Sequence, residues 1–226
     1  MGGKRGSYGV VTGLTGLTVV AGVCAFGVAA CTPRLEPPVP EKIPAVNTVS
    51  EWSRSRADPY GIPERQLRAY AYAAWRVQED NGCQLGWPTL AAVGQVASDH
   101  GRAQGSTVGD DGQTSTPLRG LPIMKMPPLT VPDTDNAVTD GDTTRDVAVG
   151  PMQIMPSRWE QHASSPEEGR TPNPDNIDDA ALTAARIMCE AGNPATPEGW
   201  DEGVKRIFHT PEAVKAVHHV AKELSR

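Results

Sequence analysis

The sequence predicts one mainly α-helical domain that is interrupted by a single long insert. Apolar side chains recur at helical spacing in several segments between residues 62 and 224, and few segments alternate as strands do. Residues 104–149 lack this periodicity and are rich in Gly, Pro, Asp and Thr. The 226 residues are 38% hydrophobic and only 5% aromatic, which favours a small core with long loops over a large β-sandwich or barrel.

The first 31 residues have the pattern of an export leader. Lys4 and Arg5 precede an uncharged apolar run over residues 10–30, which ends in the small residues of "VAAC" at Cys31. Small residues before a cysteine resemble a bacterial lipobox, which predicts cleavage and lipidation at Cys31. An uncleaved membrane anchor and a plain secretory signal are the alternatives. All three place the domain outside the cytoplasm, and the lipid anchor would hold it in the cell envelope at the outer face of the cytoplasmic membrane.

Residues 32–61 are expected to form a Pro-rich linker, and residues 62–226 the folded domain. Proline locks the backbone out of the helix and favours extended polyproline II structure, so this segment is interpreted as a stalk. Its prolines cluster in "TPRLEPPVPEKIPAV" at Pro33, Pro37, Pro38, Pro40 and Pro44.

Two helices are predicted before the insert. Pro63 suits a first helical turn, where its missing N–H costs nothing, and Gly82 ends that helix. A second helix begins near Pro88 and ends near Gly101. Apolar stripes run along both helices at Leu67, Tyr70, Ala71, Ala74, Trp75, Leu90, Val93 and Ala97.

The insert and the C-terminal half complete the predicted elements. The turn residues of 104–149 favour an ordered loop with a small β-hairpin. A short helical region begins within 149–163, and the strongest helix signal covers 173–192, where Asp175 or Asn176 can cap the first turn. A final helix is expected at 212–224.

The cysteines and the net charge limit the chemistry. Outside the leader, the chain holds only Cys83 and Cys189, which predicts one disulfide in an exported domain, with two separate buried thiols as the alternative. Two cysteines are too few ligands for a metal site. A net charge of −6 argues against nucleic-acid binding, which needs a basic face.

Three segments resemble motifs of the bacterial lytic transglycosylases, the membrane-bound type B-like group. They are "LAAVGQVASDHGR", "DGDTTRDVAVGPMQIMPSRW" and "DNIDDAALTAARIMC", they follow one another in the family's order, and the resemblance as a whole covers roughly Ile62 to Cys189. The resemblance implies a lysozyme-like fold of the goose type, and the two body cysteines stand where the family has a pair. It also implies peptidoglycan as the substrate.

The implied reaction cleaves the bond between N-acetylmuramic acid and N-acetylglucosamine and leaves a 1,6-anhydro ring. In this family one glutamic acid protonates the leaving oxygen and then removes a proton from the sugar's own hydroxyl. The chain departs from the family at this position, which is Ala97. Asp99 and His100 are the nearest substitutes, although Asp99 is expected to be solvated or paired with Arg102, and His100 to cap the helix end.

The chain differs from the family's sequence at further positions outside the first motif segment. Near the C-terminus, Thr210, Pro211, Ala213 and Ala216 stand where the family has Tyr, Asn, Ser and Tyr. Residues 164–175 offer no EF-hand-like spacing, so no calcium, other metal or cofactor is expected. The remaining candidate acids lie in the insert, at Asp110, Asp140 and Asp142.

The binding frame of the family is present. Ser98, Gly150, Pro151, Met152 and Gln153 are the predicted glycan contacts. The alternative for Ser98 is a solvated hydroxyl at the helix end, and for residues 150–153 a loop-to-helix turn with Met152 in the core. The sequence therefore predicts a catalytically inactive peptidoglycan-binding domain. An active transglycosylase and a scaffold for other cell-wall enzymes are the alternative functions.

Overall fold

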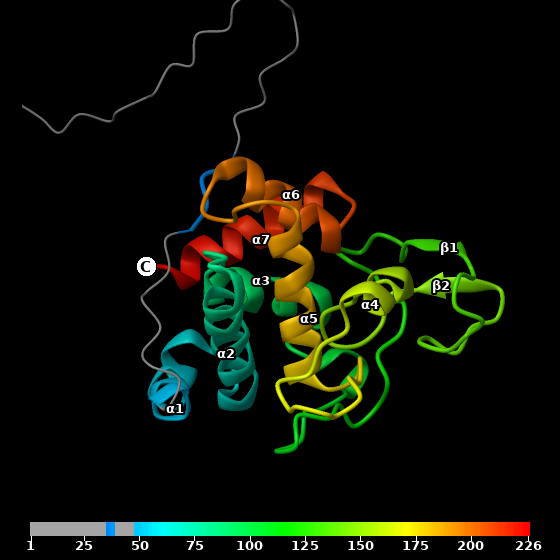
Figure 1. The fold of residues 1–226 in the computed structure, drawn as a ribbon, viewed down its shortest axis with the longest axis horizontal. Coiled ribbons are helices and arrows are strands. Elements are labelled where there is room, and N and C mark those ends of the chain that lie inside the picture. The colour runs from blue at the N-terminus through cyan, green and yellow to red at the C-terminus, as the bar shows by residue number, and fades with distance from the viewer. Residues whose placement is uncertain (1–34, 39–47) are drawn as a thin grey trace, which may run out of the picture. The chain divides into compact units, whose positions relative to one another are not determined.

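The computed structural model describes residues 35–38 and 48–226, and it confirms the mainly α-helical class (Figure 1). The expected leader lies outside the described residues. Within the described part, no helix is long and apolar enough to cross a membrane. Its helices are α1 (Val49–Tyr60), α2 (Glu64–Asn81), α3 (Trp87–Ser98), α4 (Pro156–His162), α5 (Ile177–Glu190), α6 (Pro197–Ile207) and α7 (Pro211–Leu224).

The helical domain begins earlier than predicted, because α1 lies inside the expected linker 32–61. Val49 and Trp52 are buried in the core, and the ring of Trp52 meets Trp87 edge-on at 5.3 Å between centroids. The boundary at residue 62 was therefore wrong. The apolar signal of "VSEWSRSRADPY" is one Val and one Trp a turn apart, too short a stripe to stand out beside the prolines.

A short piece of the expected stalk also contacts the domain. Leu35 packs against the hydrophobic core, and the carbonyl oxygen of Glu36 accepts a hydrogen bond from Nε2 of His218 at 2.8 Å. His218 lies on α7, so this piece of chain rests on the C-terminal helix.

The core is built around α5, which packs against both α2 and α6 (Figure 1). The close approach is possible because α5 presents alanines, whose small side chains bring neighbouring backbones near. As predicted, the helix is capped by Asn176, whose side chain accepts a hydrogen bond from the N–H of Asp178. The alanines of α5 with at most 1% exposure are Ala180, Ala181, Ala184 and Ala185.

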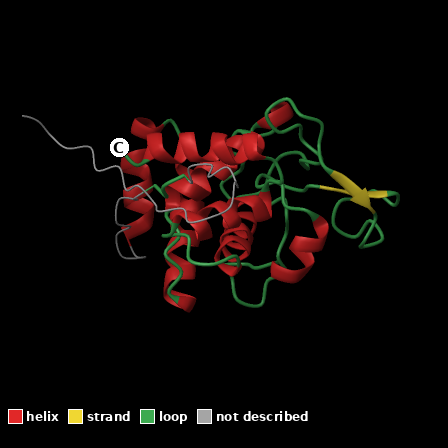
Figure 2. Cartoon of the chain, turned by 90° about the horizontal axis from the view of Figure 1, so that it is seen from above, coloured by secondary structure: helices red, strands yellow, loops and turns green. Residues whose placement is uncertain are grey.

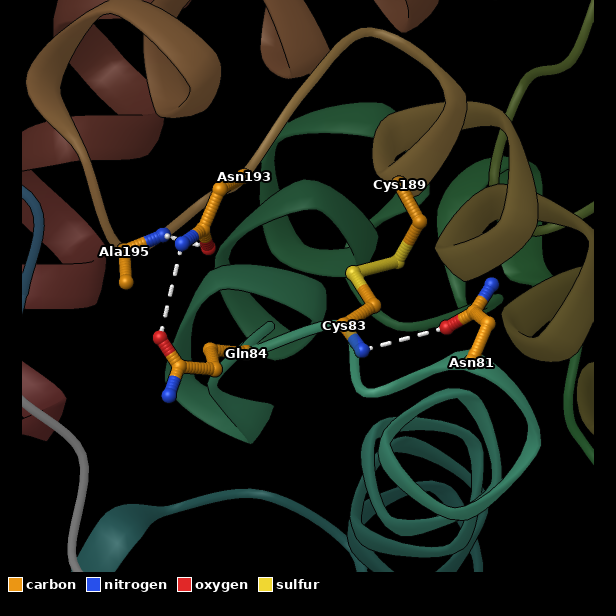
Figure 3. Close-up of a disulfide and its surroundings, with 6 residues drawn as sticks. All are labelled: Asn81, Cys83, Gln84, Cys189, Asn193 and Ala195. Atoms are coloured by element: carbon orange, nitrogen blue, oxygen red, sulfur yellow. Dashed lines mark hydrogen bonds between the residues drawn. A yellow bond between two sulfur atoms is a disulfide. The ribbon is translucent and has the colours of Figure 1, made fainter.

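The predicted disulfide is present and joins two helix ends (Figure 3). Cys83 follows α2 and Cys189 lies in the last turn of α5, with their Cα atoms 5.9 Å apart. The bond spans a sequence separation of 106 residues. Closing a loop of that length restricts the unfolded chain and stabilises the fold by about 5 kcal/mol in the chain-entropy account.

The insert contains the predicted small hairpin. Strands β1 (Thr130–Pro132) and β2 (Arg145–Val147) pair antiparallel, with Val131 opposite Asp146. Both views show this hairpin at one end of the domain, away from the helices around α5 (Figures 1 and 2).

Candidate functional site

The three motif segments converge on the turn at residues 150–153. Gly150 adopts φ +70°, and a Cβ added there would lie 1.9 Å from the carbonyl oxygen of Pro174, which precedes the third motif. Its N–H donates to the carbonyl of Leu118 in the insert. Glycine is therefore required here by the neighbouring backbone at Pro174, independently of any bound strand.

Ser98 connects the end of α3 to this turn. Its Oγ donates to the carbonyl oxygen of Pro151 at 2.6 Å and accepts from the N–H of Gly101 at 2.8 Å. The residue is only 3% exposed. The hydroxyl is thus committed to holding two motif segments together, and it is neither solvated nor directed at a ligand.

Gln153 connects the same turn to the insert. Its Oε1 accepts from the N–H of Leu121 at 2.7 Å, and its Nε2 donates to the carbonyl of Gly150 at 2.8 Å. These bonds occupy the amide that we expected to orient an acetamido group. Met152, beside it, has no exposed surface and belongs to the core, which was the alternative for this turn.

Ala97 is the residue that the resemblance aligns with the acid of lytic transglycosylases. Its methyl group belongs to the hydrophobic core and is 3% exposed. Helix α7 packs against α3, the helix that carries it. A methyl group has no proton to donate, and none of the three pockets described for this part of the chain is lined by Ala97.

The residues after Ala97 do not supply the missing acid. Asp99 is exposed and pairs with Arg102 at 2.7 Å, as one of the sequence alternatives predicted. His100 is buried, and its Nδ1 lies 3.1 Å from the hydroxyl of Tyr70. Burial, aided by the charge of Arg102, lowers the pKa of His100 to about 4. The C-cap residue of α3 is Asp99, and the main-chain N–H of His100 donates to the carbonyl of Gly94 in the same helix-end turn.

An apolar pocket of about 270 Å³ lies between the insert and the start of α7. Thr210 and Ala213, which the resemblance aligns with a Tyr and a Ser of lytic transglycosylases, line one side, and Gln153 also contributes. No acidic side chain lines this pocket. Its lining residues are Leu121, Ile123, Met126, Pro127, Pro128, Leu129, Thr130, Ala148, Gln153, Met155, Ile207, Phe208, His209, Thr210 and Ala213.

Two of the polar pocket residues have defined states. Thr210 caps α7 by accepting a hydrogen bond from the N–H of Ala213 at 3.3 Å, and its own hydroxyl hydrogen remains for a further acceptor. Partial burial and the charge of Arg158 lower the pKa of His209, which keeps its ring neutral at pH 7. The pocket thus offers neutral hydrogen-bonding groups at the edge of an apolar surface.

The candidate acids of the insert lie elsewhere. Hydrogen bonds from the hydroxyl and the N–H of Thr144 lower the pKa of Asp142 to about 2, so this carboxyl is ionised at neutral pH. Asp140 and Asp142 line a separate polar pocket beside the hairpin, together with Arg119 and Arg145. Asp110 lines neither pocket.

Sequence reasoning missed most of the apolar pocket. Its walls come from the insert at 121–130 and the junction of α6 and α7 at 207–213, which are far apart in the sequence. The signal that was available was the apolar run "LPIMKMPPL" in an otherwise polar loop, together with Phe208 just outside a helix. The apolar residues of this run do not recur at helical or strand spacing, and Phe208 is a single residue. The sequence therefore does not show which face of a helix or strand they would occupy.

Comparison with known proteins adds no further information about the site. No family model, curated protein or solved structure matches this chain. The resemblance to lytic transglycosylases therefore stays a prediction from the motif residues themselves.

Proposed function

We propose that this chain is an exported cell-wall domain of the lytic transglycosylase type, with a lysozyme-like fold, that binds peptidoglycan glycan strands without cleaving them. The observation that carries the proposal is an apolar pocket that contains motif positions but no carboxylate. Gln153 belongs to the second motif segment. Thr210 and Ala213 belong to the C-terminal stretch that departs from the family's sequence, and all three residues line the same pocket.

The meeting of the motif segments supports the family relation. Ser98 of the first segment bonds Pro151 of the second, and Gly150 of the second lies against Pro174, next to the third. Such contacts between residues tens of positions apart require one particular tertiary arrangement. The segments resemble the family separately, and it is their convergence that makes a shared fold the best account.

The absence of cleavage follows from the chemistry of the site. Splitting a glycosidic bond needs a proton donor within hydrogen-bond reach of the leaving oxygen. Ala97 offers a buried methyl group, and His100 is bonded to Tyr70 and neutral. Loss of general acid–base catalysis lowers rates by about 10²–10⁴, and by more where a single residue serves both steps.

The pocket suits a part of an amino-sugar chain. Ligand pockets are commonly about 300–1,000 Å³, so a cavity of about 270 Å³ fits one sugar-sized group. The acetamido and lactyl methyl groups of peptidoglycan are apolar and match its walls. Thr130, Thr210 and His209 offer neutral hydrogen bonds to sugar hydroxyls at the rim. Binding of this kind needs no cofactor.

The location of the domain is part of the proposal. The disulfide between Cys83 and Cys189 supports an oxidising compartment outside the cytoplasm. We propose that the leader, lipidated at Cys31 or retained, holds the domain at the membrane beside the cell wall. Other cell-wall enzymes are its candidate protein partners.

Sedimentation with purified sacculi tests the proposal. The full chain is expected to pellet with peptidoglycan and to release no 1,6-anhydro muropeptides. Leu129, which is 46% exposed and lines the pocket, is the variant position. We expect Leu129→Ser to weaken binding about tenfold, because it removes apolar contact area worth about 1–2 kcal/mol.

Val138→Ser is the matched control, since Val138 is an exposed apolar residue of the same insert that lines none of the described pockets. Its binding is expected to equal that of the unmodified chain. Release of anhydro products by the unmodified chain would establish an active enzyme. A chain that stays in the supernatant would favour the scaffold, and equal losses from both variants would remove the pocket from the binding surface.

A further inference from the structure

The polar pocket beside the hairpin, called the hairpin pocket below, adjoins the apolar pocket. It has a volume of about 490 Å³, and its walls come from the two strands, from the loop between them and from Arg119 and Gly120. Pro128 and Thr130 line both cavities, so the short segment that carries them is a wall common to the two. A ligand in the apolar pocket therefore has the hairpin pocket next to it.

The strand alternation of β2 brings a charged side chain to the hairpin pocket. Side chains two positions apart in a strand point to the same face, and Arg145 and Val147 both line this pocket. Asp146, between them, points to the opposite face and is completely buried. The side chain of Arg145 is 59% exposed, so a ligand can reach it.

The guanidinium group of Arg145 has donors that the protein does not use. Its Nε pairs with a carboxylate oxygen of Asp142 at 3.2 Å, and its two Nη nitrogens have no hydrogen-bond partner among the described residues. Arg119 differs, because both of its Nη nitrogens donate to Asp175, at 2.6 and 2.8 Å. Two N–H groups of a guanidinium match the two oxygens of a carboxylate. Arg145 is therefore the group of this pocket that can bind a carboxylate.

The hairpin pocket also contains an acid without a cation. One carboxylate oxygen of Asp140 accepts from the N–H of Asp142 at 3.0 Å, and the other accepts from the N–H of Val147 at 2.7 Å. Asp140 forms no ion pair with any residue that the structure describes, and each of its oxygens has a lone pair left for a further donor. Arg145 and Asp140 together favour a ligand that carries both a carboxylate and an ammonium group.

The loop that holds these charges is ordered by its own hydrogen bonds. The carboxylate of Asp142 accepts from the N–H of Thr144 at 2.9 Å and from the Thr144 hydroxyl at 2.6 Å. The same carboxylate pairs with Nε of Arg145, which limits the positions open to the guanidinium. A binding group that is held in place before the ligand arrives loses less conformational entropy on binding.

We propose that the hairpin pocket binds the peptide stem of peptidoglycan, with Arg145 at a stem carboxylate and Asp140 at a stem ammonium group. The inference rests on the proposed glycan binding, because the stem is attached through the lactyl group of N-acetylmuramic acid. A muramic acid in the apolar pocket brings its stem to the shared wall at Pro128 and Thr130. The stem has free carboxylates and, in its diamino acid, an ammonium group. Two or three extended residues span about 7–11 Å, which carries these charges beyond the sugar.

Calorimetry with two soluble fragments tests the stem site. The full chain, purified in mild detergent, is titrated with N-acetylglucosaminyl-N-acetylmuramyl tetrapeptide, and separately with the same disaccharide without its peptide. We expect the tetrapeptide form to bind about tenfold tighter, because hydrogen bonds to charged groups add to the sugar contacts. Added NaCl should reduce this difference, because exposed charge pairs are screened by salt.

Arg145→Gln is the site variant, since it removes the guanidinium and keeps a polar side chain. We expect it to bind the tetrapeptide form at least about threefold more weakly and the peptide-free disaccharide as the unmodified chain does. Arg76→Gln is the matched control, because Arg76 pairs with Asp80 in the same way, lies on α2 and lines none of the described pockets. Its affinity for both fragments is expected to be unchanged.

The outcomes separate this inference from the proposed function. Equal affinities of the unmodified chain for the two fragments would overturn the stem site and leave glycan binding in place. Equal effects of Arg145→Gln and Arg76→Gln on the tetrapeptide form would overturn it as well, and so would an Arg145→Gln chain that loses affinity for both fragments alike. Binding of neither fragment would overturn the glycan-binding function together with the stem site.

Discussion

At the scale of single residues, the candidate site is defined by side chains already engaged with the protein. Ser98 and Gln153 resemble glycan contacts in the sequence, yet their polar atoms hold the second motif segment to α3 and to the insert. A buried polar atom that is satisfied within the fold has little to gain from a ligand. What remains for binding is the apolar surface next to them.

Ala97→Glu is expected to restore no measurable glycan cleavage. The new carboxylate would enter the packed core from a position only 3% exposed, without a cation or donor shown beside it. We expect unfolding in urea to show a loss of about 2 kcal/mol or more. Gln95→Glu, an exposed change of similar size on the same helix, is expected to leave stability within about 0.5 kcal/mol. Anhydro-muropeptide release near that of an active transglycosylase by Ala97→Glu would contradict this prediction.

His100 is expected to make the fold sensitive to mild acid. Burial lowers its pKa from 6.5 to about 4, so the unfolded chain binds this proton more readily than the folded chain. The contribution of the neutral His100 ring to the free energy of unfolding is therefore fully present above pH 6.5. It is lost as the pH falls towards 4, by about 3 kcal/mol in total. Urea unfolding between pH 7.5 and 4 measures this decline.

His100→Asn removes the titrating ring while tolerating the left-handed backbone at φ 58°. The variant should lose less stability than the unmodified chain over this pH range. Parallel curves for the two proteins would assign the acid sensitivity to other groups.

At the scale of elements, helix class and caps depend on local sequence, while the packing of turns depends on partners far along the chain. Asn176 caps α5 and Thr210 caps α7 through bonds to residues two or three positions away, which a sequence pattern can reveal. The turn at 150–153 is different, because Leu118, Pro174 and Leu121 contact it from two other segments. Its shape is set by these neighbours.

Gly150→Ala is expected to destabilise the fold by about 3 kcal/mol or more. The added methyl group meets the carbonyl oxygen of Pro174 at 1.9 Å, and the backbone at φ +70° is itself unfavourable for alanine. Gly141→Ala is the control, since Gly141 has φ +86° but nothing within 4 Å of the new methyl. In Gly141→Ala, only the unfavourable left-handed backbone conformation should lower the free energy of unfolding, by about 1 kcal/mol. Equal losses in urea unfolding would show that the approach to Pro174 is unimportant.

At the scale of the whole molecule, α1 is part of the domain and the pocket is formed between distant segments. Trp52 of α1 covers Trp87 at the start of α3, so the residues expected to be linker complete the core. The insert in turn contributes a wall of the pocket opposite the start of α7. The domain therefore cannot be divided at residue 62 without exposing apolar surface.

Trp52→Ala is expected to lower the free energy of unfolding by about 3 kcal/mol, as for other buried tryptophans. Trp75→Ala is the control: Trp75 lies on α2, is partly exposed and contacts the ring of Tyr72. The decrease in the free energy of unfolding should be clearly smaller for Trp75→Ala than for Trp52→Ala. A negligible effect of Trp52→Ala in urea or thermal unfolding would show that α1 does not contribute to the stability of the domain.

The sequence by itself determined the helical class, most helix positions, the pairing of Cys83 with Cys189 and the alanine at position 97, where the resemblance predicts an acid. Each of these depends on residue identity, on local spacing or on the number of cysteines. Only the tertiary structure decided the engagement of Ser98 and Gln153, the inclusion of α1, the apolar pocket and the hairpin pocket. The physical reason is that each of these features consists of contacts between segments far apart in the chain, and such contacts leave no periodic signal in either segment.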